Sequence, residues 1–70
     1  MTLKEADEAA VKRLPVICDD NIHERVEYKR IVRTGYLYDE TGQRHGFVEL
    51  LDKHGHSTTY ARPEAVKLKE

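Results

Sequence analysis

Two turns of the same chemistry lie between residues 31 and 61 of this 70-residue chain: Asp39-Glu40-Thr41-Gly42 and Asp52-Lys53-His54-Gly55. Asp at the first position of such a turn accepts backbone hydrogen bonds, and Gly at the fourth takes the positive φ that closes a type I turn with a bulge. β-Branched and aromatic residues flank both turns. The repeat therefore predicts three antiparallel strands in a meander, which a short chain curls into a small barrel or sheet.

A short helix is predicted over residues 2–14, ahead of the meander. Thr2 and Glu5 have the spacing of a capping box, and Pro15 cannot continue a helix. The apolar residues at helical spacing form one narrow stripe, made of Leu3, Ala6, Ala10, Val11 and Leu14. We expect this stripe to pack on a sheet, either the chain's own or that of a partner.

The segment 16–68 is predicted to be β-rich. Residues 16–18 read as a short strand, and residues 24–38 as a long one with a bend near Lys29-Arg30 or at Gly35. Pro63 begins a single helical turn, and residues 66–68 form a closing strand. Because this order is that of SH3-like barrels, we predict a single mainly β domain over residues 1–70. It has an N-terminal helix followed by a small antiparallel, SH3-like barrel or curled sheet of about five strands.

The two turns also predict a register. With Tyr38 opposite Arg44, Tyr36 lies opposite Gly46, Thr34 opposite Val48, and Val32 opposite Leu50; with Leu51 opposite Ser57, Val48 lies opposite Tyr60 and Gly46 opposite Arg62. One face then carries Val32, Tyr36, Val48, Leu50 and Tyr60, and the other carries Ile31, Leu37, Phe47 and Leu51. We expect one face to line the interior and the helix to cover part of the other.

Composition limits the possible functions. The formal net charge is −1, whereas a dedicated nucleic-acid-binding domain usually has a pI above about 9. The single cysteine, Cys18, cannot form an internal disulfide, which favours a reducing compartment. No apolar run is long enough to span a bilayer, and the first residues lack the layout of a secretory signal. We therefore expect a cytoplasmic protein without a membrane partner.

Three stretches carry a resemblance: residues 26–31, residues 48–57 and residues 60–64, which read Val-Glu-Tyr-Lys-Arg-Ile, Val-Glu-Leu-Leu-Asp-Lys-His-Gly-His-Ser and Tyr-Ala-Arg-Pro-Glu. Over roughly residues 15–68 the chain resembles a group of short uncharacterised proteins of Firmicutes prophages and integrative elements. The resemblance implies a small β-rich, SH3-like domain from a mobile element. It implies no activity, cofactor or catalytic residue.

Metal binding and catalysis are weakly indicated. Zinc sites need about four converging ligands, usually with paired Cys or His spacings, and the spacing of the available residues, His23, His45, His54, His56, Cys18 and Asp52, does not fit. We expect exposed turn histidines and no metal. Cys18 is interpreted as a small buried hydrophobic residue rather than as a nucleophile paired with His23. Without a catalytic or cofactor motif, we predict that the protein is not an enzyme and uses no cofactor.

Binding is better indicated than catalysis. Aromatic and basic residues occur together along the predicted strands, namely Tyr28, Lys29, Arg30, Arg33, Tyr36, Tyr38, Arg44, Tyr60 and Arg62. The predicted register gathers Tyr36, Tyr38, Arg44 and Arg62 at one end of the sheet, and these four are the candidate binding residues. Stacked aromatic and basic groups suit single-stranded nucleic acid. In the alternative, Tyr36 and Tyr60 are core residues, and Arg33 and Arg62 pair with Glu49 and Glu64.

We favour a small module for protein–protein interaction, including self-association as a homodimer, because small barrels offer aromatic grooves and open strand edges. Nucleic-acid binding through the Tyr and Arg cluster is the alternative, and the missing basic excess counts against it.

Overall fold

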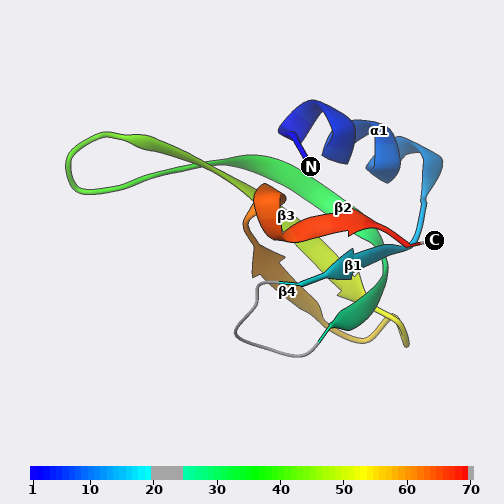
Figure 1. Cartoon of the computed structure of the whole chain (residues 1–70). Helices are drawn as coiled ribbons and strands as arrows, with labels where there is room; N and C mark the ends of the chain where they lie inside the picture. Colours follow the sequence, from blue (N-terminus) through cyan, green and yellow to red (C-terminus); the bar gives the residue numbers. More distant parts are fainter. Residues whose placement is uncertain (20–24, 70) are drawn as a thin grey trace.

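The structure, a computed structural model, describes residues 1–19 and 25–69 and contains one N-terminal helix and a five-stranded antiparallel sheet (Figure 1). The strands lie in the order β4-β3-β2-β1-β5, and the sheet curls without closing. This confirms the predicted fold class. The elements are α1 (Leu3–Lys12), β1 (Val16–Cys18), β2 (Val26–Tyr38), β3 (Arg44–Asp52), β4 (Thr58–Ala61), the 3₁₀ turn η1 (Pro63–Ala65) and β5 (Val66–Leu68).

Residues next to each end of α1 determine where the helix begins and ends. The Thr2 hydroxyl accepts a bond from the Glu5 backbone N–H at 3.1 Å, and the Glu5 carboxylate accepts one from the Thr2 N–H at 3.0 Å. This is the predicted capping box. At the other end Arg13 has a positive φ of 56°, and the Leu14 N–H donates to the carbonyl of Ala9 at 3.0 Å. The helix therefore ends at Lys12, before Pro15 exerts its effect.

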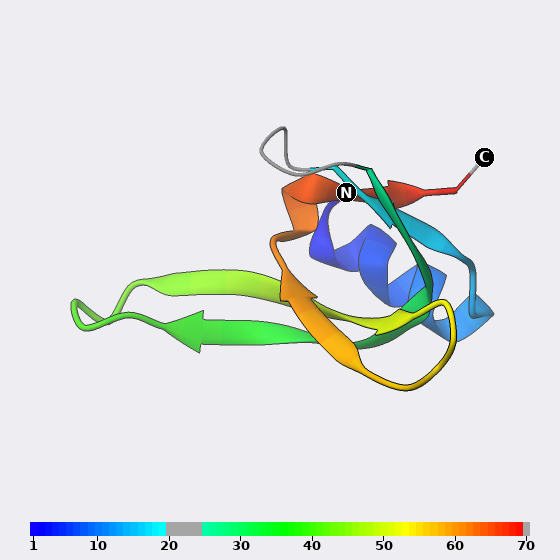
Figure 2. The same ribbon diagram turned by 90° about the horizontal axis from the view of Figure 1, so that it is seen from below.

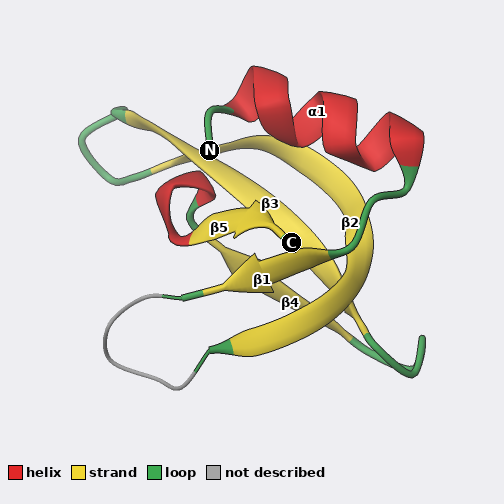
Figure 3. Ribbon diagram, turned by 45° about the vertical axis from the view of Figure 1, so that its right-hand side comes forward, coloured by secondary structure: helices red, strands yellow, loops and turns green. Residues whose placement is uncertain are grey.

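The helix packs on its own sheet (Figure 3). The core cluster consists of Ala6, Ala9, Val16, Ile31, Val48, Leu50 and Val66. Small alanines let α1 approach the strands closely. The predicted stripe was wrong at Val11, whose side chain is 83% exposed. Because each helical residue turns by roughly 100°, a face centred on Ala6 and Ala9 leaves Val11 on the far side.

The predicted pairing of β2 with β3 is correct next to the first turn and wrong farther from it. Tyr38 opposes Arg44, Tyr36 opposes Gly46 and Thr34 opposes Val48. Further along, Ile31 rather than Val32 opposes Leu50, because β2 contains irregularities between Tyr28 and Arg30 and between Ile31 and Arg33. The bend expected near Lys29-Arg30 is present, whereas Gly35 pairs regularly with Phe47. The bulge at Val32 brings Ile31 into the core in its place.

The predicted register of the second turn was wrong by one residue. The Asp52 N–H donates to the Ser57 carbonyl at 2.9 Å, so the loop is one residue longer than the first. Leu51 consequently opposes Thr58, and Tyr60 opposes Glu49 instead of Val48. A slip of one residue exchanges the faces of a strand. Tyr60 is therefore 59% exposed on the outer face and not part of the core.

The β2–β3 hairpin projects from the body of the molecule (Figure 2). β1 pairs with β2 only at Val26–Tyr28, and β4 pairs with β3 only at residues 48–51. The segment 35–47, called the arm below, is thus a two-stranded ribbon that no other described strand borders. Its projection contributes to the unequal extents of the molecule, 36 × 28 × 22 Å.

Candidate binding surface on the hairpin arm

The turn at the tip of the arm is held by one carboxylate. Asp39 Oδ1 accepts bonds from the backbone N–H groups of Thr41 at 2.9 Å and Gln43 at 3.0 Å, and from the Thr41 hydroxyl at 2.6 Å. Gly42 has a φ of 82° and donates to the Asp39 carbonyl at 3.0 Å. Both features were predicted from the Asp-x-x-Gly pattern. The turn therefore fixes how the two strands of the arm meet.

The same bonds favour the ionised form of Asp39. The Thr41 hydroxyl, followed by the His45 ring and the Gln43 N–H, holds the pKa of Asp39 well below its usual value of 3.8. His45 Nε2 lies 2.9 Å from Asp39 Oδ2. The second turn is built alike: Asp52 accepts from the N–H groups of His54 and His56, and its pKa is also lowered, chiefly by the bond from His56.

One face of the arm brings three of the candidate residues together. Tyr36, Tyr38 and Arg44 share this face because Tyr36 pairs with Gly46 and Tyr38 pairs with Arg44. The Arg44 guanidinium lies over the Tyr36 ring, with Cζ 4.2 Å from the ring centroid. Tyr36 is 47% and Tyr38 69% exposed. The face therefore presents aromatic and cationic surface to the solvent.

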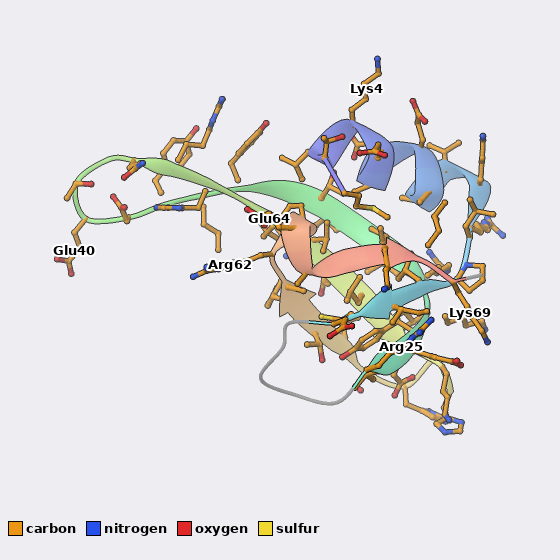
Figure 4. The ribbon with its side chains drawn as sticks, viewed as in Figure 1. Lys4, Arg25, Glu40, Arg62, Glu64 and Lys69 are labelled. Atoms are coloured by element: carbon orange, nitrogen blue, oxygen red, sulfur yellow. The ribbon has the colours of Figure 1, made fainter. Side chains whose placement is uncertain are left out.

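Arg62 does not join this group. It lies just before η1, and within the described chain no hydrogen bond, ion pair or ring contact links it to Tyr36, Tyr38 or Arg44. Figure 4 shows its side chain pointing outward from this segment. The predicted opposition of Arg62 to Gly46 depended on the register of the second turn. In the structure the β3–β4 ladder ends at Val48 and Ala61.

The opposite face of the sheet carries a cluster that sequence reasoning missed. Arg33 Nη2 donates to the Tyr60 hydroxyl at 2.9 Å, and Arg33 Nε lies 3.1 Å from Glu49 Oε1. The Arg33 guanidinium also lies 5.4 Å from the centroid of the Phe47 ring, which meets the Tyr60 ring edge-on at 5.6 Å. The pairing of Arg33 with Glu49, which belonged to the alternative interpretation, is present. Only the correct register of the second turn would have revealed the rest.

Leu37 continues this outer face along the arm. Its side chain is 60% exposed and pairs across the ribbon with His45. Tyr36, Leu37 and Tyr38 therefore expose apolar surface on both faces of one strand. The charges nearby are mixed, since Asp39 and Glu40 at the tip outnumber Arg44; Figure 4 places Glu40 at the far end of the arm.

A second concave surface lies between α1 and β5. This groove of about 380 Å³ has an apolar floor that includes Ala9, Leu14 and Val66. The amino nitrogen of Met1 donates to the carbonyls of Pro63 at 2.8 Å and Val66 at 3.0 Å, at the start of β5. The edge of β5 is thus partly occupied by the chain itself, in contrast to the edge of β2 along the arm.

The histidines lie on the turns. The rings of His54 and His56 are 6.5 Å apart at their centroids, and His45 contacts Asp39. Among residues 1–19 and 25–69, no three His, Cys, Asp or Glu side chains are grouped so that they could hold a metal ion. His23 lies outside the described residues, as does its suggested pairing with Cys18.

Comparison of the chain with protein-family models, curated proteins and solved structures finds no match. In the part of the chain that the structure describes, no helix has the length and apolar character needed to cross a membrane.

Proposed function

We propose that this chain is a non-catalytic protein-interaction module that binds through the hairpin arm. The observation that carries the proposal is the run of consecutive apolar side chains, Tyr36, Leu37 and Tyr38, exposed by 47%, 60% and 69% on a ribbon that no other described strand borders. Large apolar side chains that are exposed together on one short segment of a small protein are typical of an interaction site. A two-stranded ribbon is also marginally stable by itself, so a partner that covers it would stabilise it.

The backbone of the arm supports binding by strand addition. The Asp39 N–H donates to the Gln43 carbonyl at 3.1 Å, which makes residues 39 and 43 a hydrogen-bonded pair. Hydrogen-bonded and non-hydrogen-bonded pairs alternate along an antiparallel ladder. Leu37 and Gly35 therefore bond to β3, while the N–H and C=O groups of Tyr36 and Tyr38 point toward the free edge of β2. These groups can pair with an added strand.

The open five-stranded sheet, with its strand order and a single 3₁₀ turn before the last strand, supports the proposed likeness to SH3-like domains. Such small β domains bind extended segments along their exposed edges and aromatic surfaces. The arm lengthens one edge well beyond the packed body.

Single-stranded nucleic acid is the second candidate. The stacking of Arg44 on Tyr36 at 4.2 Å, next to exposed Tyr38, supports it, because bases stack on such pairs. The charges oppose it: Asp39 and Glu40 lie at the tip, Glu49 pairs with Arg33, and the chain has a net charge of −1. Binding to phosphates requires a positive surface that these residues do not provide.

Site-specific photo-crosslinking in cells of the source organism tests the proposal. A photoreactive phenylalanine analogue replaces Tyr38 in one variant and Val11 in a control; Val11 is even more exposed, at 83%, and lies on α1. We expect protein adducts, identified by mass spectrometry, at position 38 and none at position 11. Adducts with nucleic acid at position 38 would favour the second candidate. Absent or equal adducts at the two positions would contradict the proposal.

A further inference from the structure

We infer that the partner of the arm is a second copy of this chain, with the β2 edges of the two copies paired antiparallel about a two-fold axis at Leu37. The inference rests on the proposed function and names its partner. The free edge of β2 along the arm lacks the features that usually prevent pairing with another strand. Proteins protect free strand edges with Lys, Pro, bulges or inward charges. Residues 35–38, Gly-Tyr-Leu-Tyr, contain no charge and no proline, and their pairing with β3 is regular.

The sequence of the edge is complementary to itself. Tyr36-Leu37-Tyr38 reads the same in both directions. In an antiparallel pair centred on Leu37, each Tyr36 lies opposite the partner's Tyr38, and the two Leu37 residues lie opposite each other. Each of these three exposed apolar side chains then meets another exposed apolar side chain. Aromatic pairs directly across two strands are among the more stabilising combinations.

The backbone groups match the same register. Tyr36 and Tyr38 direct their N–H and C=O groups toward the free edge, as derived above from the bond between Asp39 and Gln43. Pairing Tyr36 with the partner's Tyr38 makes both residues hydrogen-bonded positions. Leu37 then becomes a non-hydrogen-bonded position, where the facing side chains are closest. An isologous contact of this kind forms a closed dimer and not a fibre.

The surroundings limit the pairing to this short stretch. The Thr34 hydroxyl donates to Asp7 of α1, so the helix lies against β2 where the arm leaves the body. At the base of the arm, the register places Arg33 diagonally opposite the partner's Asp39, a pair of opposite charges. No like charges face each other at the centre. The interface consists of the arms of the two copies.

The free edge of β3 is less suited to self-pairing. Its residues along the arm include Arg44 and His45, which carry or can carry positive charge. A symmetric pairing of this edge would bring two such groups together, which is the arrangement that protects edges in monomeric proteins. The difference between the two strands of the arm therefore selects β2 as the dimer interface.

Sedimentation equilibrium of the purified chain tests the inference. We expect a monomer–dimer equilibrium in the wild-type chain and a monomer in Leu37→Lys, because two lysines would face each other at the axis. Val11→Lys makes the same chemical change on exposed α1 and should leave the dimer intact. Circular dichroism checks that both variants fold. A wild-type chain that is monomeric throughout, or a Leu37→Lys chain that still dimerises, would overturn the inference.

A disulfide at the axis tests the register. The Cα atoms of a non-hydrogen-bonded pair lie about 4.5 Å apart, within the range of roughly 4.4–6.8 Å that a disulfide spans. Under mild oxidation, Leu37→Cys should form a covalent dimer, whereas the wild-type chain with Cys18 alone and a Val11→Cys variant should not. Equal cross-linking of Val11→Cys would contradict the register.

Different results would contradict the proposed interaction function and the proposed self-association. If the purified chain is monomeric while position 38 cross-links to a different protein in cells, the self-association is wrong and the interaction function stands. If neither a dimer nor an adduct at position 38 forms, both are wrong.

Discussion

The Arg44 guanidinium lies over the Tyr36 ring, 4.2 Å from Cζ to the centroid, and joins the two strands of the arm beyond the hydrophobic core. Tyr36 belongs to β2 and Arg44 to β3, and they are diagonal neighbours because Tyr38 opposes Arg44. The pair holds a cation against an aromatic ring whose side chain is 47% exposed. It thus links the stability of the arm to the chemistry of the surface that we propose binds a partner.

A double-mutant cycle should detect this pair. We expect Tyr36→Ala and Arg44→Ala to be coupled by about 0.5 kcal/mol in the free energy of unfolding, because an exposed cation–π contact contributes about 0.5–1 kcal/mol. Urea unfolding of the wild-type chain, both single variants and the double variant measures it. Arg44→Lys serves as the control, since it keeps the charge and loses the planar stacking group. Strictly additive effects would mean that the contact contributes nothing.

Binding should be lost without loss of the fold when the other tyrosine of the arm is removed. Tyr38 is 69% exposed, so Tyr38→Ala combined with Arg44→Ala should abolish partner binding and leave the core unchanged. Circular dichroism and the sedimentation experiment described above measure the two effects. An unfolded double variant would show that these residues are structural.

The stability of the chain should fall in acid through Asp39. The folded chain lowers the pKa of this carboxyl below its usual 3.8, first through the Thr41 hydroxyl and then through His45. A folded-state pKa that is depressed stabilises the folded state above the unfolded value, and this stabilisation is lost as the pH falls through the folded value. Urea unfolding at neutral pH and below about pH 4 should therefore show a decline.

The Asp39→Asn variant shows how much of this loss of stability in acid is caused by Asp39. Asn keeps an oxygen that can accept the bonds from Thr41 and Gln43 but carries no charge. We expect the stability difference between the wild-type chain and the variant to shrink as the pH is lowered. A difference that stays constant or grows would show that Asp39 is not responsible. Asp52→Asn is a parallel variant, because the pKa of Asp52 is lowered in the same direction.

The features that could be predicted from the sequence are those fixed within a few residues. The cap formed by Thr2 and Glu5, and the turns formed by Asp39 and Gly42, use side chains and backbone groups that are neighbours in the chain. Tyr36, Tyr38 and Arg44 were predicted to gather at one end of the sheet for the same reason, since the first turn sets their register directly. Local chemistry was sufficient for these residues.

The features that could not be predicted depend on small differences in length. The same Asp-x-x-Gly pattern closes a loop one residue longer at Asp52, where the N–H pairs with Ser57. A bulge near Val32 likewise moves Ile31 into the core. The local sequence is compatible with either loop length at Asp52, and with a strand that has or lacks the bulge near Val32. The packing of the whole sheet selects between them. The cluster of Arg33, Phe47 and Tyr60 was missed because it exists only in the register that packing selects.

The tip of the arm should require a residue that tolerates a positive φ. Gly42 has a φ of 82°, and no atom lies within 4 Å of the position of an added Cβ. Gly42→Val should therefore lower the free energy of unfolding by roughly 1–3 kcal/mol, from backbone strain alone. Gly42→Asn, which adopts this conformation more readily, should cost less. Urea unfolding compares them, and a Val variant as stable as the wild-type chain would contradict the turn geometry.

Gly35 should be required for a different reason, which is the Phe47 ring directly across the ribbon. The position of a Cβ on Gly35 lies 2.9 Å from Phe47 Cε1, which is closer than real Cβ contacts come, and 3.2 Å from Cζ, which is tighter than most of them. The φ of Gly35 is not positive, so an alanine is acceptable to the backbone and would otherwise stabilise the strand slightly. The ring must move instead, away from its edge-on contact with Tyr60 and from the Arg33 guanidinium. We expect Gly35→Ala to destabilise the chain by about 1–3 kcal/mol, as overpacking does.

A compensating change separates this steric effect from any general effect of replacing a glycine. Phe47→Leu removes the ring edge that meets the new methyl group, so the double variant should be more stable than the sum of the two single variants predicts. Urea unfolding of the four chains gives the coupling, and the NMR signals of the Tyr60 ring should shift in Gly35→Ala if the Phe47 ring moves. Additive effects with unchanged Tyr60 signals would mean that Gly35 and Phe47 do not constrain each other. The cluster on the outer face would then be independent of the arm, whereas coupling would show that the two surfaces are joined through this one cross-strand contact.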